Sequence, residues 1–254
     1  MGGLIRRLEP GYTDSEAAIG QGSDPRDDLV AQWLDVAAES GMPLDPLIWR
    51  SSPLSGTHPA CMAVKAAAEQ GPEPAYRYLR RLREGIFCER RKLDHADPLI
   101  AAAGEAGLNQ SRFEVDLRSH AMTEAFGEDL EEVRSISDEA REKGAARTTE
   151  GRERVAFPSA VFVGEDGERR GVWGIEGFAE LREAALASGA VPVETGPLEP
   201  MDAIDRFGRC ATAELAALAG DRPLPVLEAE LWAAARDWRL KPVRVLTGTL
   251  WEKA

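Results

Sequence analysis

The sequence predicts an α/β protein in which a long helical block lies between two parts that contain β-structure. Apolar residues recur at helical spacing between residues 29 and 133, and the connections between these runs are short. Strand signals lie at residues 160–173 and in the last dozen residues, and residues 1–5 would suit the end of a strand. With 254 residues, of which 43% are hydrophobic and 30% charged, the chain can bury a substantial core in one or two domains.

The helical block is predicted from six apolar stripes. They begin at Leu29 and end near Val133, and Asp94 and Asn109 are the expected N-caps of two of the helices. Because the helices are short and closely connected, we expect antiparallel neighbours. After this block, residues 147–154 are polar and are expected to form a loop.

A β-hairpin and a helix are predicted next. The apolar run of residues 160–163 reads as a strand, Asp166-Gly167 as a hairpin turn, and residues 170–173 as the returning strand. Residues 177–187 then form an amphipathic helix, with Phe178 on its expected inward face.

The C-terminal part is predicted to be a separate small unit. Residues 191–200 contain three prolines and read as a linker. Three helices are expected over residues 201–238, and a hairpin follows with strands at residues 243–246 and 249–251. Three helices followed by a hairpin indicate a winged-helix-like domain over residues 201–254.

The charge of the chain argues against several partner classes. A formal net charge of −13 disfavours nucleic acid and anionic membranes, which bind to basic surfaces. No stretch approaches the ~18 apolar residues of a membrane span. The start at Met1–Arg7 has no long apolar core, so no secretory signal is expected and the predicted location is the cytoplasm.

Three cysteines lie far apart in the sequence, at positions 61, 88 and 210, and no Cys-x-x-Cys is present. Cys61, Cys88 and Cys210 are expected to be small buried residues without a disulfide framework. Cys88 is the best candidate for a reactive thiol, because the cations of residues 90–92 follow it and nearby cations lower the pKa of a thiol.

No cofactor or metal site is predicted. His58, His95 and His120 lack ligand spacing, and no phosphate-binding loop or nucleophile motif stands out. A basic cluster lies within and just after the helix predicted over residues 76–87: Arg77, Arg80, Arg81, Arg83, Arg90, Arg91 and Lys92. It reads either as a site for an anion such as the carboxylates of glutathione, or as a solvated face paired with Glu84, Glu89 and residues 128–132; charged helix faces are common, which favours the second reading.

Phe157-Pro158-Ser159 stands directly before the strand of residues 160–163. Proline cannot donate a hydrogen bond to a sheet ladder, so it belongs on an edge, at the first residue of a strand or at a bulge. From the residues alone, an ordinary trans proline that opens an edge strand is the favoured reading.

A set of short motifs nevertheless gives the chain a family resemblance. They are Met1-Gly2-Gly3-Leu4, Ile48-Trp49, His58-Pro59-Ala60, the segments 78–84 and 89–91, Phe113, Leu117, Ala125-Phe126 and Phe157-Pro158-Ser159. In this order and spacing the chain resembles the DsbA-like thioredoxin-fold oxidoreductases, in the cytoplasmic branch related to FrnE. The resemblance covers residues 1–190. It implies a thioredoxin-like fold with a helical insertion at about residues 27–145 and without its first strand and dithiol helix.

The resemblance also implies a role for the proline segment. Pro158 would be the cis-proline that faces the substrate, and Phe157 to Ser159 would pair with an extended peptide or with a protein thiol or disulfide substrate. No residue of this chain is expected to be catalytic, because thiol–disulfide exchange requires a thiolate that the missing dithiol would supply. Two explanations stay open: a start placed too late at an internal methionine, or a redox-inactive descendant that covers its strand edges by forming a homodimer.

Three functions follow as expectations. The first is a DsbA-family thiol–disulfide oxidoreductase or isomerase homologue that is redox-inactive as written. The second is a glutathione-dependent kappa-type transferase or 2-hydroxychromene-2-carboxylate isomerase-like enzyme, which uses the split fold without a Cys-x-x-Cys. The third is a non-enzymatic peptide-binding or scaffold protein. For the C-terminal unit, few basic residues on its second and third helices favour protein contact over DNA binding.

Overall fold

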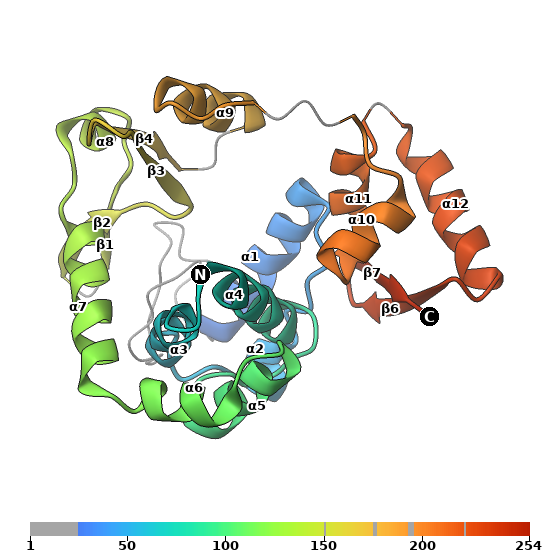
Figure 1. The fold of residues 1–254 in the computed structure, drawn as a ribbon, viewed down its shortest axis with the longest axis horizontal. Helices are drawn as coiled ribbons and strands as arrows, with labels where there is room; N and C mark the ends of the chain where they lie inside the picture. The colour runs from blue at the N-terminus through green and yellow to red at the C-terminus, as the bar shows by residue number, and fades with distance from the viewer. Residues whose placement is uncertain (1–24, 150, 175–176, 193–195, 221) are drawn as a thin grey trace.

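The computed structural model describes residues 25–149, 151–174, 177–192, 196–220 and 222–254. Figure 1 shows helices α1–α6 in the centre and lower part of the view, α7 at the left, α9 with β3 and β4 above them, and α10–α12 with β6 and β7 at the right. The strand end expected within residues 1–5 lies outside the described residues.

The helical block contains two short helices more than the six that the sequence predicts, one near its start and one at its end. Its helices are α1 (Pro25–Ser40), α2 (Ile48–Ser51), α3 (His58–Ala68), α4 (Pro72–Phe87), α5 (Ala96–Glu105), α6 (Gln110–Leu117), α7 (His120–Arg134) and α8 (Asp138–Glu142). The helices α2 and α8 have only four and five residues, too few for an apolar period to be recognised.

The two predicted N-caps have different outcomes. The side chain of Asn109 accepts a hydrogen bond from the backbone N–H of Arg112, so this cap is confirmed. The prediction for Asp94 is wrong, because α5 begins one residue later, with His95 at the N-cap position. The Asp94 carboxylate instead accepts a 2.6 Å hydrogen bond from the backbone N–H of Ser55 and so joins two loops.

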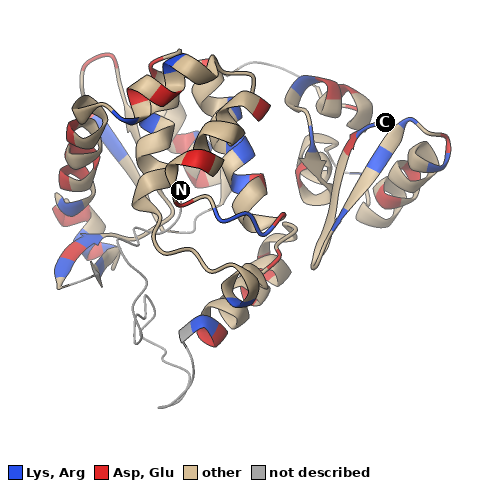
Figure 2. Cartoon of the chain, turned by 90° about the horizontal axis from the view of Figure 1, so that it is seen from below, with Lys and Arg blue, Asp and Glu red and all other residues tan. Residues whose placement is uncertain are grey.

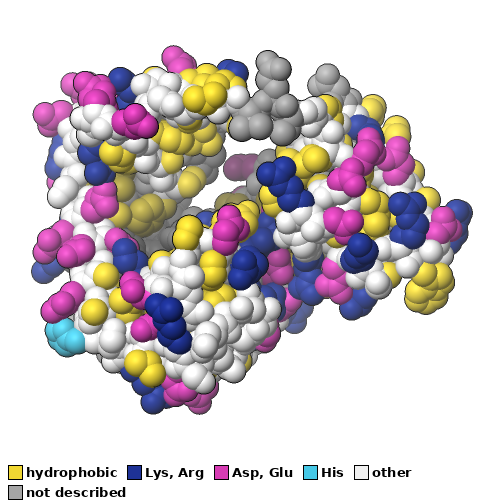
Figure 3. Space-filling model, viewed as in Figure 1, with side chains coloured by type: hydrophobic (Ala, Val, Ile, Leu, Met, Phe, Trp, Pro, Cys, Tyr) yellow, Lys and Arg dark blue, Asp and Glu magenta, His cyan; other side chains and the backbone are white. Residues whose placement is uncertain are grey.

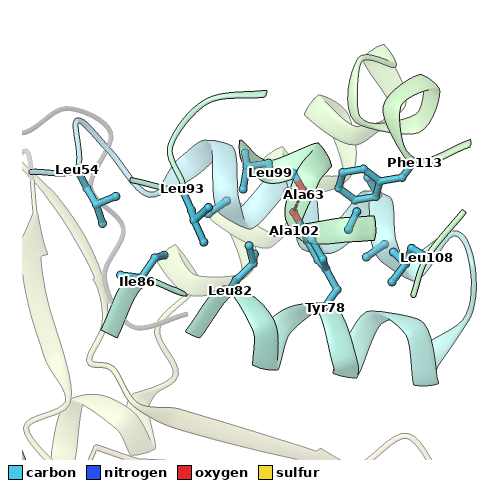
Figure 4. Packing of buried hydrophobic residues seen from close by; sticks show 14 of the residues in the cluster. Leu54, Ala63, Tyr78, Leu82, Ile86, Leu93, Leu99, Ala102, Leu108 and Phe113 are labelled. Atoms are coloured by element: carbon cyan, nitrogen blue, oxygen red, sulfur yellow. Dashed lines mark hydrogen bonds between the residues drawn. The ribbon is translucent and has the colours of Figure 1, made fainter. Parts of the chain in front are cut away.

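The core of the block is built on one face of α4 (Figure 4). Tyr78, Leu82 and Ile86 recur at four-residue spacing on this helix and are at most 2% exposed. The ring of Tyr78 packs against that of Phe113, with centroids 5.0 Å apart, and its hydroxyl donates a 3.0 Å hydrogen bond to the carbonyl of Leu99. The buried hydroxyl is thereby satisfied, and α4, α5 and α6 are fixed to one another.

The prediction of a polar loop over residues 147–154 is wrong. The chain forms an antiparallel hairpin of β1 (Ala146–Thr149) and β2 (Arg152–Val155), which turns at Gly151 with φ 73°. The backbone N–H of Ala156 extends the pairing by donating to the carbonyl of Ala145, at 2.7 Å. The hairpin is not recognisable from the sequence, because its strands lack apolar alternation. It is held by backbone hydrogen bonds and by the buried Ala145, Val155 and Ala156 at its base.

The second hairpin lies where the sequence places it. β3 (Ser159–Val163) pairs antiparallel with β4 (Arg169–Trp173), with Val161 opposite Gly171. The helix α9 (Phe178–Ala187) packs on these strands. The inward orientation predicted for Phe178 is wrong, because its side chain is 80% exposed. The hairpin beneath α9 has only two strands and is too narrow to cover the first turn of the helix.

The C-terminal unit consists of three helices and a three-stranded sheet. Its elements are α10 (Pro200–Phe207), β5 (Cys210–Ala211), α11 (Thr212–Leu218), α12 (Leu224–Arg236), β6 (Leu240–Val245) and β7 (Gly248–Lys253). The sheet order is β5-β7-β6, so the predicted hairpin is joined by a third strand, β5, that was not predicted. Both hairpin strands are longer than expected, and the predicted strand end at Leu246 lies in the turn.

The C-terminal unit is attached to the helical block by backbone contacts as well as by side chains. Thr247 Oγ1 accepts a 2.7 Å hydrogen bond from the backbone N–H of Leu44 and donates one of 3.0 Å to the carbonyl of the same residue. Beside this contact Ala211, Val245 and Leu250 form a buried apolar cluster, against which Cys88 of the helical block packs. The two parts therefore share a small core.

Candidate functional site

The segment before β3 is held in a defined conformation. The peptide bond between Phe157 and Pro158 is cis, the form that the resemblance implies. The hydroxyl of Ser159 donates a 2.7 Å hydrogen bond to the carbonyl of Ala156 and accepts one of 3.1 Å from the backbone N–H of Gly174. Pro158 itself is exposed, so the structure leaves the tip of this loop accessible.

Phe157 anchors the loop to the structure below it. Its ring packs against the buried cluster of Ala140, Ala145, Val155 and Ala156. The guanidinium of Arg154 lies 4.8 Å from the centre of this ring, although Arg154 is only 6% exposed. A cation over an aromatic face is attractive, and more so where water is excluded. Phe157 is thus a structural anchor, and the neighbouring Pro158 is the residue turned to the surface.

One edge and one face of the β3–β4 hairpin are uncovered in the part of the chain that the structure describes. Among the described strands, β3 pairs with β4 alone. Arg170 of β4 donates a hydrogen bond to the carbonyl of Ala187, so α9 is fastened to the hairpin. On β3, Val161 and Val163 are 38% and 59% exposed. Figure 3 shows hydrophobic side chains gathered on the wall of the hollow beside these hairpins.

The composition of β3 sets it apart from the other strands. Among the described strands of four residues or more, β3 alone contains neither a charged residue nor a proline. The edge strand β6 of the C-terminal sheet, by contrast, carries Lys241, Pro242 and Arg244. Charges and prolines on edge strands prevent unwanted pairing. The β3 edge is therefore chemically suited to accept another extended backbone.

The residue that shapes the open face was not predicted. The ring of Trp173 lies over Gly171, two residues earlier on the same strand, where a Cβ would overlap the ring. Only glycine leaves room for the ring at this position. A glycine two residues before a tryptophan in a predicted strand is the signal that could have indicated this packing.

The cysteines do not form a redox site. Cys61 lies on α3, Cys88 ends α4 and Cys210 lies on β5, and all three are free thiols. Burial raises the pKa of Cys61, raises that of Cys88 to about 12 and raises that of Cys210 to about 11. Carboxylates near Cys88, led by Glu84, add to its shift. Cys88, the best candidate for a reactive thiol, is therefore not activated, since the cations of residues 90–92 do not lower its pKa.

The basic cluster of α4 is occupied by carboxylates rather than free for an anion. Arg80 pairs with Glu214 of the C-terminal unit at 2.8 Å, and Arg81 contacts Glu89 and lies 2.7 Å from Glu105. The expected pairing with Glu84 and Glu89 is confirmed. The expected pairing with residues 128–132 is wrong, because Asp129 pairs with Lys65 and Glu132 with Arg169. These pairs are only partly exposed, because the C-terminal unit covers the end of α4; Figure 2 shows both charge signs side by side on the helices.

Arg209 completes this junction from the other side. Its guanidinium lies 2.7 Å from Glu89 and 2.6 Å from Glu252. Burial would raise the pKa of Glu89, but hydrogen bonds from Arg81 and Arg209 outweigh it and lower the pKa below its usual range. Burial does raise the pKa of Glu84 in spite of three nearby arginines. The cluster thus joins the two parts of the chain.

The histidines are used in local contacts. The ring of His58 packs against Phe126 at 5.0 Å, while His95 lies 3.1 Å from Asp94 and His120 lies 3.1 Å from Glu124. Within the described residues, no three His, Cys, Asp or Glu side chains come together as metal ligands would. A search of the same residues finds no helix both long and apolar enough to cross a membrane.

Comparison with known proteins supports a thioredoxin-like domain. A family model described as Thioredoxin matches residues 22–137, which is the helical block. The chain is 33% identical to the ClpXP adapter protein SpxH of Halalkalibacterium halodurans over 116 residues, which are 46% of this chain and 38% of that protein. It is 29% identical to SpxH of Shouchella clausii over 227 residues (87% and 68%) and 25% identical to SpxH of Bacillus subtilis over 231 residues (88% and 71%).

These matches differ in what they cover. The family model ends before β1, so it does not reach Phe157-Pro158-Ser159. The alignments with the Shouchella and Bacillus proteins cover most of this chain but only about two thirds of those proteins, and the Halalkalibacterium alignment covers 38% of its relative. The similarity supports a thioredoxin-like domain of mixed helices and strands.

Proposed function

We propose that this chain is a non-enzymatic protein-binding member of the DsbA-like branch of thioredoxin-fold proteins, which captures an extended segment of another protein at the edge of β3. The observation that carries the proposal is the combination of an exposed Pro158 and an adjacent strand, β3, with one uncharged edge to which no other described strand pairs. An added strand satisfies the free backbone groups of such an edge, and side chains of the peptide contact the exposed valines.

The substrate-binding residues in this proposal are Phe157, Pro158 and Ser159. Phe157 fixes the loop, Ser159 orients the start of β3 through its two hydrogen bonds, and Pro158 presents the surface beside which the peptide lies. The proposal also includes the helical insertion, a winged-helix-like C-terminal domain and the predicted cytoplasmic location. The order of α10, α11, α12 and the β6–β7 hairpin supports the winged-helix-like form.

The state of the thiols favours binding over redox chemistry. Exchange requires a thiolate, and burial raises the pKa values of all three thiols. The glutathione-dependent alternative loses its expected anion site, because Arg80 and Arg81 are paired with carboxylates. Protein binding is thus the function to which the described residues are best suited.

The β3 edge can be tested with reduced, carboxymethylated α-lactalbumin, an unfolded protein without free thiols. We expect it to bind the wild-type chain and to lose at least tenfold in affinity for Val161→Lys, because the new charge blocks strand addition. Val115→Lys is the matched control, since Val115 is 70% exposed on α6, away from the hairpin. A Cys61/Cys88/Cys210→Ser variant should bind like the wild type. Equal binding by both lysine variants, or turnover of insulin disulfides by the wild type, would contradict the proposal.

The similarity to ClpXP adapter proteins extends the proposal to a second partner. An adapter presents a bound protein to a protease, so we propose that this chain also contacts ClpX. The test is biolayer interferometry of the immobilised chain with purified ClpX and a non-hydrolysable ATP analogue. Saturable binding that persists in the Val161→Lys variant is expected, since the β3 edge would serve the client protein. The absence of binding to ClpX would exclude the adapter role and leave peptide binding intact.

A further inference from the structure

The end of α12 has an unusual backbone. Trp238 follows the C-cap residue Asp237 and has φ 57°, in the left-handed region. Its N–H donates to the carbonyl of Ala235, and the N–H of Arg239 donates to that of Ala234, which is the hydrogen-bond pattern of a Schellman motif. Glycine is the usual residue at this position, because a bulky side chain there is strained.

Other helices of the same chain show the usual solution. Among the described helices, six are followed by a glycine with positive φ, namely Gly41, Gly107, Gly144, Gly189, Gly208 and Gly220. The only other non-glycine residue with positive φ in the described residues is Arg90, whose guanidinium is held by Asp45 at 2.7 Å. Trp238 is 86% exposed, so the fold itself recovers almost nothing from its large apolar side chain.

A second tryptophan, within α12 itself, is also accessible. Trp232 is 44% exposed and packs edge-on against the buried Trp251, with ring centres 5.0 Å apart. The guanidinium of Arg244 lies 5.2 Å from the centre of the Trp232 ring. Trp and Arg that are rigidly supported from below are the residue types most often found at the energetic centre of protein interfaces.

Two arginines lie beside these tryptophans. Arg239 follows Trp238 directly in the sequence, and Arg244 lies on the Trp232 ring. The other basic residues of the segment 232–244 are paired, Arg236 with Asp237 at 3.3 Å and Lys241 with Glu252 at 2.7 Å. Figure 3 shows hydrophobic side chains among Lys, Arg, Asp and Glu on the C-terminal unit, at the right of the view. Trp232, Trp238, Arg239 and Arg244 are together termed the tryptophan–arginine surface below.

We propose that the tryptophan–arginine surface docks an acidic segment of a partner protein, one that carries at least one large apolar side chain. The cations match the acidic residues, and the exposed indole of Trp238 gains on binding the burial that the free fold does not provide. Nucleic acid is disfavoured, because a phosphate backbone is bound by a row of several Lys and Arg, whereas this surface offers Arg239 and Arg244. This surface is independent of the β3 edge, so neither proposal depends on the other.

The first test asks whether Trp238 is costly to the free fold. Trp238→Gly should raise the melting temperature by about 2 °C or more, because glycine relieves the left-handed strain, whereas Trp238→Ala keeps the strain and should leave it almost unchanged. A lower melting temperature for Trp238→Gly would overturn the argument, since the indole would then be supporting the fold.

The second test identifies the partner chemistry with a phage library of random 12-residue peptides selected against the full-length chain. We expect enrichment of Asp- and Glu-rich peptides with a large apolar residue, and at least a tenfold loss of their affinity for Trp238→Gly and for Arg239→Glu. Phe178→Ala, which removes an equally exposed aromatic ring from α9, is the control and should bind normally. Basic peptides, acidic peptides that bind Trp238→Gly equally well, no enrichment, or tighter binding of a duplex DNA would each overturn the proposal.

Discussion

Replacement of Arg209 by methionine is the sharpest test of how the two parts of the chain are held together. Arg209 lies between Glu89 and Glu252, with N–O distances of 2.7 and 2.6 Å, and 3.5 Å from Glu84. These four side chains are only 14–25% exposed. Methionine keeps most of the apolar stem and removes the charge, so the variant isolates the electrostatic contribution.

The expected loss in free energy of unfolding follows from the carboxylates that remain. Breaking a buried ion pair by removing one partner costs about 3–5 kcal/mol, and an exposed pair is worth about 0–1 kcal/mol. Because this cluster is partly solvated and Glu252 and Glu89 keep Lys241 and Arg81, we expect a loss of about 2 kcal/mol, which corresponds to roughly 4–8 °C in melting temperature.

The assay is urea unfolding followed by tryptophan fluorescence, in parallel for Arg209→Met and for Arg236→Met. Arg236 is the control, since its side chain is 78% exposed and pairs with Asp237 at 3.3 Å, so its loss should cost less than about 0.5 kcal/mol. High salt should reduce the difference between the two variants. Equal stability of the two variants would show that the junction depends on the Leu44–Thr247 contact and the apolar cluster rather than on charge.

Three further predictions concern single side chains. Tyr78→Phe should lose about 1–2 kcal/mol in urea unfolding, because the carbonyl of Leu99 is left without its donor in a buried site. Asn109→Ala should lose about 1 kcal/mol through its cap, and Asn109→Asp should retain most of it. Cys88 should react with iodoacetamide at pH 8 far more slowly than a free thiol, because its pKa is about 12. Because folding raises this pKa, the stabilisation from the neutral thiol is complete below about pH 9, the pKa of the unfolded chain, and is lost as the pH rises toward 12. Fast alkylation, or a free energy of unfolding that does not change between pH 9 and 12, would contradict this prediction.

The helical block was predictable because its signal is repeated many times. Tyr78, Leu82 and Ile86 mark one face of α4 at the helical period, and Asn109 announces α6 through its own side chain. Asp94 shows the limit of the same reasoning. A carboxylate before a helix can serve the cap or a distant backbone N–H, and only the tertiary structure brings Ser55 to it.

The β1–β2 hairpin and the orientation of Phe178 were not predictable for a related reason. The hairpin contains arginines and threonines with no apolar alternation. Its stability depends on the buried cluster that includes Ala140 of α8 and Ala145, which precede the hairpin in the sequence. Phe178 has the right spacing for a core position on α9. Its exposure depends on how wide a sheet lies beneath the helix, and the spacing of residues within α9 carries no information about that width.

The two proposed binding surfaces show the same distinction between residue type and environment. Val161 and Trp238 are ordinary core-type residues in the sequence, and neither would be singled out by composition. Their significance comes from what surrounds them. Val161 lies on an uncharged strand edge that no other described strand pairs with, and Trp238 has a left-handed backbone and is followed by Arg239. An isolated chain would gain from replacing either residue: a lysine at position 161 would protect the strand edge from unwanted pairing, and a glycine at position 238 would remove the backbone strain. Two such costs on separate parts of the chain argue for two separate partners.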